Sequence, residues 1–373
     1  MNLFNSGLKN KIAELNSALD LLKERIGTLE NENNRAHAIL DSMIEGVIAV
    51  DRDTRIISLN PTAEKIFNVS QANARGRIFL EVFPNNDIAE VIAVVLDKGE
   101  FVSRELNLVW PVQKVFQVNA SPISEAGGVN GCLLVIHDIT EIRRLENMRR
   151  DFVANVSHEL KTPLTSIKGF VETLLEGALD DKENSVNFLK IINNHADRLN
   201  TLINDLLDLS HIESKEISLK KDKFGLCALV KEVMLGFRSQ AKKKGIEIKN
   251  ELPQDIEIFA DRSKIEQVFT NLINNAIKYN KEKGFARIYS EQLPGRIKII
   301  VEDSGSGIPP KDIPRIFERF YRVDKARSRE LGGTGLGLSI VKHIIELHSG
   351  VVGVESTEGL GSKFWFTIPK HPS

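Results

Sequence analysis

One histidine of the chain stands in surroundings that suit phosphoryl chemistry. His158 lies in a predicted long helix, two residues from the apolar positions Val156 and Leu160. Two residues turn a helix by about 200°, so we expect the imidazole to point away from the apolar seam and into solvent. Imidazole is largely neutral at cytoplasmic pH, and a neutral ring nitrogen can attack phosphorus. His158 is therefore a candidate phosphoacceptor, although a lone histidine on a helix surface is more often an ordinary solvated residue.

Three residues that follow His158 can assist such a reaction. Glu159 comes next and can accept the imidazole proton or hold one tautomer. Thr162 lies four residues on, on the same helical face, where its hydroxyl can position a water for the reverse, phosphatase direction. Pro163 leaves the carbonyl of Glu159 without an N–H partner, and a proline inside a helix costs about 3 kcal/mol. We therefore expect the helix to bend beside the reactive side chains.

A polar helix further along the chain offers groups for a metal and a phosphate. Asn271 and Asn275 are four residues apart and share one helical face. Amide oxygens suit Mg²⁺, which keeps several waters when bound, and Asn271 is the candidate metal ligand. Lys278 can meet phosphate charge, and Tyr279 can contact a nucleotide. Asparagine-rich helical faces are more often simply solvated, so this motif has weight only beside others.

A glycine-containing turn follows the apolar strand predicted at 297–301. Asp303 begins this turn and can accept a hydrogen bond from an adenine amino group, while Gly305 and Gly307 let the backbone approach a base. Further on, Phe317 and Phe320 would anchor a lid, and Arg322 beside them can stabilise charge on a transferring phosphate. An isolated D-x-G-x-G sequence is as often a plain turn.

A second glycine-rich segment covers residues 332–339 and opens a helix. Its candidate phosphate-binding residues are Gly333, Thr334, Gly335, Leu336 and Gly337. Backbone N–H groups and the positive end of the dipole attract phosphate at a helix N-terminus. No lysine follows these glycines as in a Walker P-loop, and their spacing differs from the G-x-G-x-x-G dinucleotide fingerprint.

Together these segments resemble the sequence boxes of sensor histidine kinases. Segment 157–164 matches their phosphoacceptor box, and four later segments match the N, G1, F and G2 boxes of their ATPase domain, in order: 271–279, 303–308, 317–322 and 332–339. That domain has a Bergerat-type α/β sandwich fold shared with gyrase, Hsp90 and MutL proteins. The resemblance covers roughly residues 142–370. This part of the chain is similar in kind to the phosphate-responsive and cell-wall-responsive sensor kinases.

The resemblance implies an ATP:protein-histidine phosphotransferase of a two-component system. Such an enzyme uses ATP and Mg²⁺ to phosphorylate its own His158, passes the phosphoryl group to an aspartate of a response regulator, and can dephosphorylate that regulator. It works as a homodimer. His158, Glu159, Thr162 and Arg322 would then be its catalytic residues. Two alternatives stay open: an ATP-driven conformational clamp of the gyrase or Hsp90 class, and a scaffold that acts mainly as a regulator phosphatase.

The elements that must position these residues begin with a heptad pattern at the N-terminus. Apolar residues recur in alternating steps of four and three, with Asn33 at the next seam position: Leu8, Ile12, Leu15, Leu19, Leu22, Ile26 and Leu29. The pattern predicts a coiled coil over residues 1–35 and favours a dimer. A single amphipathic helix packed on a domain is the alternative.

Residues 36–138 have the pattern of a mixed α/β domain. Strands are expected at 46–51, 55–60, 101–110, 114–121 and 129–137, and Asn60-Pro61 caps a helix through Phe67. The order closes on His137-Asp138-Ile139-Thr140 and resembles a PAS sensor domain. Such domains can hold haem, flavin or metabolites. Here the histidines lie at the domain edges and the single cysteine in an apolar strand, so we expect neither haem nor flavin.

The remaining chain predicts a helical hairpin and then a sandwich. Over residues 139–220, apolar residues at helical spacing indicate two long helices joined by a short polar loop. Two such hairpins would bury their apolar faces in a dimeric four-helix bundle. Over residues 221–373, helices alternate with strands and predict the ATP-binding α/β sandwich. The fold class expected is therefore multidomain, α and α+β.

Composition sets limits on partners and location. The chain has 373 residues, enough for two or three domains, and its 50 Lys and Arg nearly balance its 51 Asp and Glu. This balance gives no reason to expect nucleic acid or an anionic membrane as partner. Cys132 and Cys227 stand apart and suggest buried thiols. Apolar runs fall short of the ~20 residues of a membrane span, and no signal peptide is visible. We expect a cytoplasmic chain, or the cytoplasmic part of a longer membrane-tethered sensor.

Overall fold

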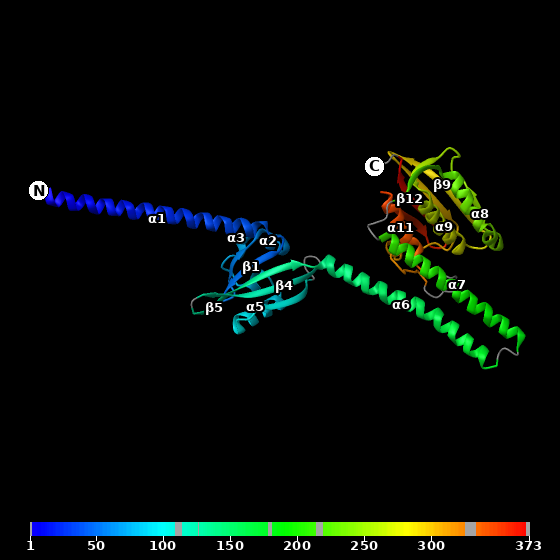
Figure 1. The fold of residues 1–373 in the computed structure, drawn as a ribbon, viewed down its shortest axis with the longest axis horizontal. Helices are drawn as coiled ribbons and strands as arrows, with labels where there is room; N and C mark the ends of the chain where they lie inside the picture. Colours follow the sequence, from blue (N-terminus) through cyan, green and yellow to red (C-terminus); the bar gives the residue numbers. More distant parts are fainter. Residues whose placement is uncertain are drawn as a thin grey trace. The chain divides into compact units, whose positions relative to one another are not determined.

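The chain divides into two compact units, Met1–Arg149 and Arg150–Ser373. The computed structural model describes residues 2–108, 114–125, 127–177, 181–213, 219–324 and 333–370 (Figure 1). Within these ranges no helix is long and apolar enough to cross a membrane.

The first unit opens with the long helix α1, Asn2–Ser42. It continues past residue 35, where the coiled coil was expected to end. Four apolar seam residues have described side chains, and each is at least half exposed: Leu19, Leu22, Ile26 and Leu29. The side chains of Leu8, Ile12 and Leu15 lie outside the described part. An apolar seam that faces solvent is what a helix awaiting a coiled-coil partner presents, and the coiled coil itself stays a prediction.

A five-stranded antiparallel sheet forms the body of the first unit. Its strands lie in the order β2-β1-β5-β4-β3 and have these bounds: β1 Gly46–Asp51, β2 Ile56–Leu59, β3 Val102–Leu108, β4 Lys114–Glu125 and β5 Gly128–Asp138. Residues 109 and 110, expected to end the third strand, lie outside the described residues. Four helices pass between β2 and β3: α2 Pro61–Phe67, α3 Gln71–Ala74, α4 Phe79–Val82 and α5 Asn86–Lys98. The predicted succession along the chain, two strands, short helices and then three strands, is confirmed.

The core of this unit is apolar and closely packed. Helix α5 buries Ile88, Val91, Ile92 and Val95 against the sheet because they recur at helical spacing. Cys132 is fully buried in β5, and this burial raises the pKa of its thiol to about 11. The predicted buried thiol is therefore found, in its inert protonated form.

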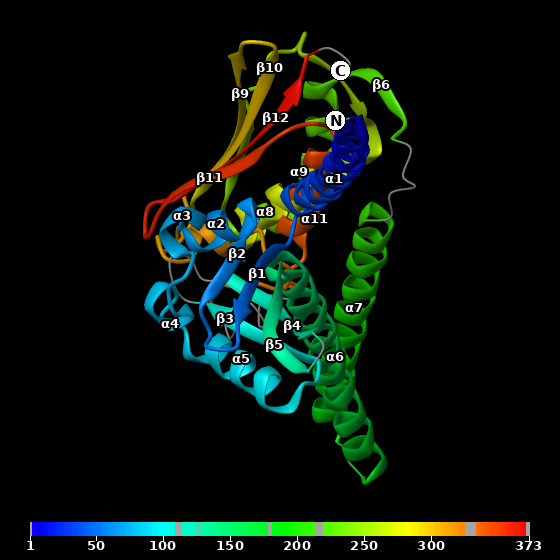
Figure 2. The ribbon, with the colours of Figure 1, turned by 90° about the vertical axis from the view of Figure 1, so that its left-hand side faces the viewer.

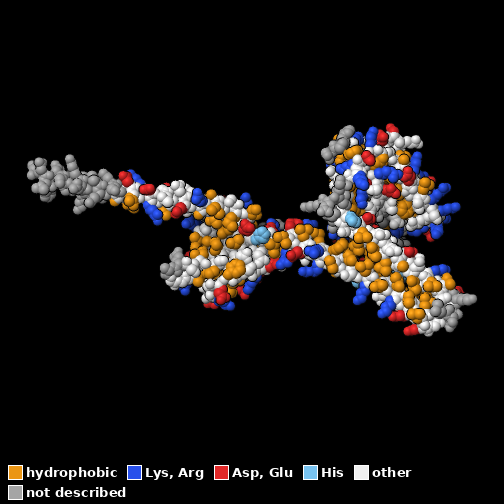
Figure 3. Space-filling view, viewed as in Figure 1, with side chains coloured by type: hydrophobic (Ala, Val, Ile, Leu, Met, Phe, Trp, Pro, Cys, Tyr) orange, Lys and Arg blue, Asp and Glu red, His pale blue; other side chains and the backbone are white. Residues whose placement is uncertain are grey.

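Two long helices begin the second unit and lie antiparallel, side by side (Figures 1 and 2). They are α6, Thr140–Leu175, whose first turns belong to the first unit, and α7, Lys182–Glu213. Pro163 lies inside α6, as expected. Hydrophobic side chains line the side of the pair that Figure 3 shows. The large apolar side chains that the two helices expose include Leu164, Leu175, Leu189 and Leu207. A helix pair that leaves so much apolar surface in solvent fits the predicted bundle with a second copy.

An α/β sandwich completes the second unit. Its mixed sheet has the order β11-β12-β10-β9-β7, in which only β7 and β9 pair in parallel, and its strands are β7 Glu247–Asn250, β9 Phe285–Leu293, β10 Arg296–Asp303, β11 Val352–Thr357 and β12 Gly361–Pro369. A smaller sheet pairs β6 Lys221–Gly225 with β8 Glu257–Asp261.

Three helices cover one face of the larger sheet (Figure 2): α8 Leu226–Lys244, α9 Arg262–Lys278 and α11 Gly337–Leu347. A short 3-10 helix, η2, spans Ile313–Arg315. Helix α11 is apolar on its sheet side, where Ile340, Val341, Ile344 and Ile345 are almost fully buried. The predicted sandwich is confirmed. The polar ends of its helices lie at one edge of the apolar core.

Candidate functional site

A cavity of about 350 Å³ lies in the second unit, between α9, the turn after β10 and the segments on either side of residues 325–332. Its volume is in the range of small-molecule sites, about 300–1,000 Å³. Of the predicted catalytic and binding residues, these line it: Asn271, Asn275, Lys278, Tyr279, Asp303, Gly307, Arg322, Gly333, Thr334, Gly335 and Gly337. Residues separated widely in sequence thus meet in one cavity.

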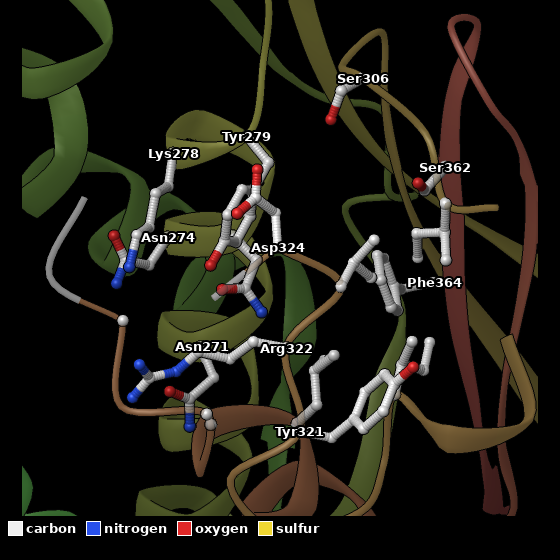
Figure 4. A pocket seen from close by; sticks show the side chains of 18 of the residues that line it. Asn271, Asn274, Lys278, Tyr279, Ser306, Tyr321, Arg322, Asp324, Ser362 and Phe364 are labelled. Carbon is white, nitrogen blue, oxygen red and sulfur yellow. The ribbon is translucent and has the colours of Figure 1, made fainter. Parts of the chain in front are cut away.

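Helix α9 supplies one wall of the cavity. Asp261 caps its N-terminus by accepting a hydrogen bond from the N–H of Lys264 at 3.2 Å. Steps of four and three place Asn271, Asn275 and Lys278 on one face, opposite the apolar face that packs into the core. Figure 4 shows Asn271 and Lys278 on the same side of the cavity with Asn274, which lines it as well and which the sequence reasoning did not single out.

Lys278 is a buried cation in a positive environment. Its side chain is almost fully enclosed, since the residue is 9% exposed. Burial, together with the charges of Arg322, Arg198 and Lys244, lowers the pKa of its ammonium group to about 8. A desolvated cation among other cations is unfavourable by itself. An anion bound in the cavity would relieve that cost.

Asp303 lies at the end of β10 and is also buried. Loss of solvent raises the pKa of its carboxyl to about 6, although the N–H of Gly305 donates to its Oδ1 at 2.8 Å. Gly305 therefore acts by orienting this carboxylate and does not itself line the cavity. Gly307 has a φ of +66°, and a Cβ there would lie 2.0 Å from the carbonyl oxygen of Thr357. Only glycine fits this turn.

Asn280 ties the turn that carries Asp303 to the end of α9. Its Nδ2 donates to the carbonyls of Ala276 and Phe285 at 2.8 and 2.9 Å, and its Oδ1 accepts from the hydroxyl of Ser304 at 3.0 Å. The residue is buried. This side chain fixes the distance between the two walls that Lys278 and Asp303 occupy.

The glycine-rich segment closes the cavity on another side. Gly335 has a φ of +76°, and a Cβ there would lie 2.9 Å from the backbone of Phe320, whose N–H donates to the Gly335 carbonyl at 2.9 Å. Gly337 begins α11. The side chain of Leu336 is fully buried in the core and anchors the segment, and its role in binding stays a prediction. Gly332 lies outside the described residues.

Arg322 enters the cavity from the segment after Phe320 (Figure 4). Its side chain is only 5% exposed. One terminal nitrogen, Nη2, donates to the Thr334 carbonyl and to Oε2 of Glu159, both at 2.9 Å. Its Nε has no hydrogen-bond partner among the described residues. A buried donor without an acceptor is costly, and a phosphate oxygen is the acceptor that an arginine fits well.

The predicted phosphoacceptor residues lie on α6, outside the cavity lining. His158 is exposed, as its place on the helix indicated, and Thr162 is exposed one turn later. The Thr162 hydroxyl donates to the His158 carbonyl at 3.0 Å. Glu159 is largely buried, and its Oε2 accepts from Nη2 of Arg198 at 3.0 Å as well as from Arg322. The structure therefore brings Glu159 and Arg322 together and leaves the His158 ring in solvent.

Helix α7 contributes residues that the sequence reasoning missed. Thr201 and Asp205 line the cavity, and Arg198 holds Glu159. Steps of three and four separate these residues, so they form a polar stripe on one face of α7. That stripe was visible in the sequence, but it matches no motif.

Family models match three consecutive segments of the chain. Residues 40–144 match the PAS fold, residues 148–215 match the His Kinase A (phospho-acceptor) domain, and residues 260–372 match the histidine kinase-, DNA gyrase B- and HSP90-like ATPase. The segments follow one another in the order that the sequence boxes indicated.

Relatives resemble the chain over nearly its whole length. A Staphylococcus aureus protein named sensor protein kinase WalK is 36% identical over 369 residues, which cover 96% of this chain and 88% of that protein. The Bacillus subtilis sensor histidine kinase WalK is also 36% identical, over 93% of this chain. The chain spans 60% and 57% of the full length of the first two such proteins.

A solved structure has a similar fold. It contains the histidine kinase ThkA in complex with the response regulator protein TrrA, and the matched chain is 30% identical with a TM-score of 0.50. The match covers 90% of this chain and 98% of that chain.

Proposed function

The chain belongs to the sensor histidine kinases, and from this premise we propose that it phosphorylates its own His158 from ATP. The phosphoryl group would then pass to an aspartate of a response regulator. The cavity of the second unit is the proposed nucleotide site. One observation carries the proposal: a cavity of the second unit holds Lys278, a cation buried among other cations, and the buried Nε of Arg322, which has no hydrogen-bond partner among the described residues, and the same unit carries an exposed histidine.

The lining residues fit the parts of ATP. The buried Asp303 carboxylate can accept a hydrogen bond from the adenine amino group. Lys278, Arg322 and the N–H groups of Gly335 and Gly337 suit the phosphates. Asn271 and Asn275 offer amide oxygens for Mg²⁺, which, when bound, neutralises phosphate charge and orients the phosphates.

The chemistry proposed for His158 follows from its exposure. A ring nitrogen attacks the γ-phosphorus, the bond from that phosphorus to the bridging oxygen breaks, and ADP leaves with the electron pair. Glu159, the next residue, takes the imidazole proton. Because His158 does not line the cavity in this arrangement, the sandwich must move on the helix pair so that nucleotide and imidazole meet.

The partners proposed are a second copy of the chain and a response regulator. The exposed apolar side of α6 and α7 provides the surface for a second copy. Around His158 the helix is polar and accessible, which suits docking of a receiver domain. Thr162 is proposed to orient a water for removal of phosphate from that regulator.

Radiolabelling with γ-labelled ATP tests the proposal. The wild-type chain should acquire label that is stable in alkali and lost in acid, as expected for phosphohistidine. His158→Gln should abolish this label while nucleotide binding persists. His195→Gln, a change of the same type on α7, is the matched control and should label normally. Label that survives in His158→Gln would contradict the assignment.

A further inference from the structure

A carboxylate of the helix pair occupies the glycine-rich side of the cavity. Asp205 reaches there from α7, and its Oδ2 accepts a hydrogen bond from the hydroxyl of Thr334 at 2.6 Å. Thr334 is buried, with 8% of its surface exposed. It belongs to the segment whose backbone and hydroxyl groups suit phosphate oxygens. The anion that this segment binds in the structure is therefore a side chain of the protein itself.

A second carboxylate, that of Glu159, binds Arg322, another candidate for phosphate binding. Nη2 of Arg322 donates to Glu159 of α6 and to the carbonyl of Thr334, so one arginine nitrogen joins the helix pair to the glycine-rich segment. Arg198 fixes the same oxygen of Glu159 from α7. The two side chains best suited to phosphate, Arg322 and Thr334, are thus both engaged by carboxylates from α6 and α7.

A carboxylate and a phosphate use these donors in the same way. Both are anions that accept charge-assisted hydrogen bonds from arginine and hydroxyl groups. Inside a cavity shielded from solvent, two anions repel more strongly than in water. Asp205 and a nucleotide phosphate therefore cannot both occupy the neighbourhood of Thr334 without a large electrostatic cost.

The position of the Asp205 carboxylate in the cavity is also unfavourable for its charged form. Burial raises the pKa of its carboxyl, and the charge of Asp208 raises it further, while the bond from Thr334 lowers it. The ionised carboxylate is thus less favoured here than in water, and this cost lowers the free energy that a ligand needs to displace it.

We propose that Asp205 is a built-in competitor of the nucleotide phosphates, which with Glu159 holds the catalytic domain against the helix pair until ATP displaces both carboxylates. This inference rests on the proposed function of the cavity. Displacement frees Thr334 and Arg322 for phosphate and also frees Glu159. While Glu159 is bonded to Arg322 and Arg198, it is poorly placed to take a proton from His158. Nucleotide binding and activation of the proton acceptor are therefore one event.

A matched pair of substitutions on α7 isolates the competing charge. Asp205→Asn keeps an oxygen that can accept from the Thr334 hydroxyl but removes the negative charge. Asp208→Asn makes the same change three residues on, where the carboxylate accepts from Nε2 of Gln267 at 2.7 Å and does not line the cavity. Both remove a carboxylate that joins α7 to the sandwich. Only the first removes an anion from the phosphate-binding side.

Calorimetric titration of the full chain with ATP and with adenosine tests the proposal. Asp205→Asn should raise the affinity for Mg-ATP about tenfold, within the usual range of coupling between two states, and should leave the affinity for adenosine, which has no phosphate, unchanged. Asp208→Asn should change neither. Asp205→Ala, which removes the hydrogen bond as well, should raise ATP affinity at least as much.

The outcomes separate this proposal from the function on which it rests. Unchanged or weaker ATP binding by Asp205→Asn would overturn it, and so would an equal gain for adenosine or for Asp208→Asn. If the wild-type chain binds ATP and labels His158 while these variants behave alike, competition by Asp205 is wrong and the kinase function stands. If the wild-type chain binds no ATP, the proposed function itself fails.

Discussion

The two units of the chain both build a five-stranded sheet with helices against it, yet they treat buried polar groups in opposite ways. Among the described residues of Met1–Arg149, Asn60 alone is a buried polar side chain. In Arg150–Ser373 many are buried, and most lie in the sandwich: Ser185, Asp261, Lys278, Asn280, Glu302, Asp303, Asp312, Thr334, Ser339, His348, Ser362 and Thr367. The contrast lies in the buried groups around the cavity.

Asn60 shows what a structural polar group looks like. Its Oδ1 accepts from the N–H groups of Val47 and Ala63 at 2.8 and 2.9 Å, and its Nδ2 donates to the carbonyls of Leu40 and Glu45. The amide thus fixes the end of α1, the start of β1 and the cap of α2. Such a fully bonded group stabilises a fold.

The cavity of the second unit shows the reverse. Lys278 is buried among cations, the pKa of Asp303 is raised by burial, and the Nε of Arg322 has no partner among the described residues. Burial without a full set of partners is unfavourable for such groups, and the proposed nucleotide would supply partners for them. The comparison teaches that the buried amide of the first unit completes the fold, whereas the second unit holds buried charges that suit a ligand.

The largest effect is expected from Gly307→Ala. The new Cβ would lie 2.0 Å from the Thr357 carbonyl oxygen at a φ of +66°, so the turn that carries Asp303 must shift. We expect ATP affinity to fall about 100-fold, since backbone distortion at a binding turn costs on the order of 3 kcal/mol. Gly359→Ala is the control, because its φ is +81° but its Cβ would meet open space. Calorimetry that gives equal affinities for the two variants would refute the role of this turn.

Asn60→Ala should affect stability alone. Loss of the α2 cap and of three further hydrogen bonds should destabilise the first unit by roughly 3 kcal/mol. Nucleotide affinity should not change. Asn85→Ala, which removes a single cap bond to the N–H of Ile88, should cost about 1 kcal/mol. Denaturant unfolding followed by circular dichroism measures both, and a comparable loss in the two variants would show that the amide network of Asn60 matters little.

Lys278→Met should raise the stability of the second unit and weaken ATP binding, unlike Asn60→Ala, which should affect stability alone. Replacing a cation buried among other cations by an apolar chain of similar length should stabilise the second unit by about 1 kcal/mol. The same change should weaken ATP binding about tenfold, the worth of one charge-assisted hydrogen bond. Lys342→Met is the control, since Lys342 lies on the exposed surface of α11. A Lys278 variant that is less stable than the wild type would contradict the claim that this buried charge destabilises the second unit.

These outcomes show which features the sequence could predict. Local periodicity predicted the helices and strands because each depends on its own apolar pattern. The sequence pointed to Asp303, Gly307 and Gly335 because a turn with unusual backbone angles requires glycine at fixed positions, and such glycines are visible in the sequence. Leu336 was also predicted to bind, and its side chain lies in the core, so any contact with a ligand would come from its backbone.

The contacts of α7 could not be predicted in the same way. Arg198 and Asp205 meet Glu159 and Thr334 only because the helix pair docks on the sandwich, and that docking depends on side chains far apart in sequence. A polar stripe on one helix face does not reveal its partner. The engagement of Glu159 by two arginines was hidden for the same reason.

The smallest effect concerns His348, a buried group of the second unit that is satisfied. Its Nε2 accepts from the N–H of Asp261 at 3.0 Å, and its Nδ1 lies 2.7 Å from the Ile344 carbonyl. Burial lowers the pKa of this histidine below its ordinary value. The unfolded chain therefore binds a proton that the folded unit resists, and the free energy of unfolding should fall as pH drops below about 6.5.

This contribution is at most about 1.4 kcal/mol per pH unit, and it should level off once the folded pKa is passed. The difference in unfolding free energy between the wild type and His348→Gln, taken from pH 7.5 to 5, isolates it from the carboxyl groups. The difference should shrink towards acid pH. A constant difference would mean that the imidazole does not titrate differently on folding.

Direct localisation of the phosphoryl group tests the central claim of a cavity that supplies phosphate to an exposed histidine. The full chain, incubated with Mg-ATP and digested under alkaline conditions, should yield by mass spectrometry a single phosphorylated peptide, modified at His158. Phosphate on another residue, or an unmodified chain that nevertheless binds and hydrolyses ATP, would contradict the account.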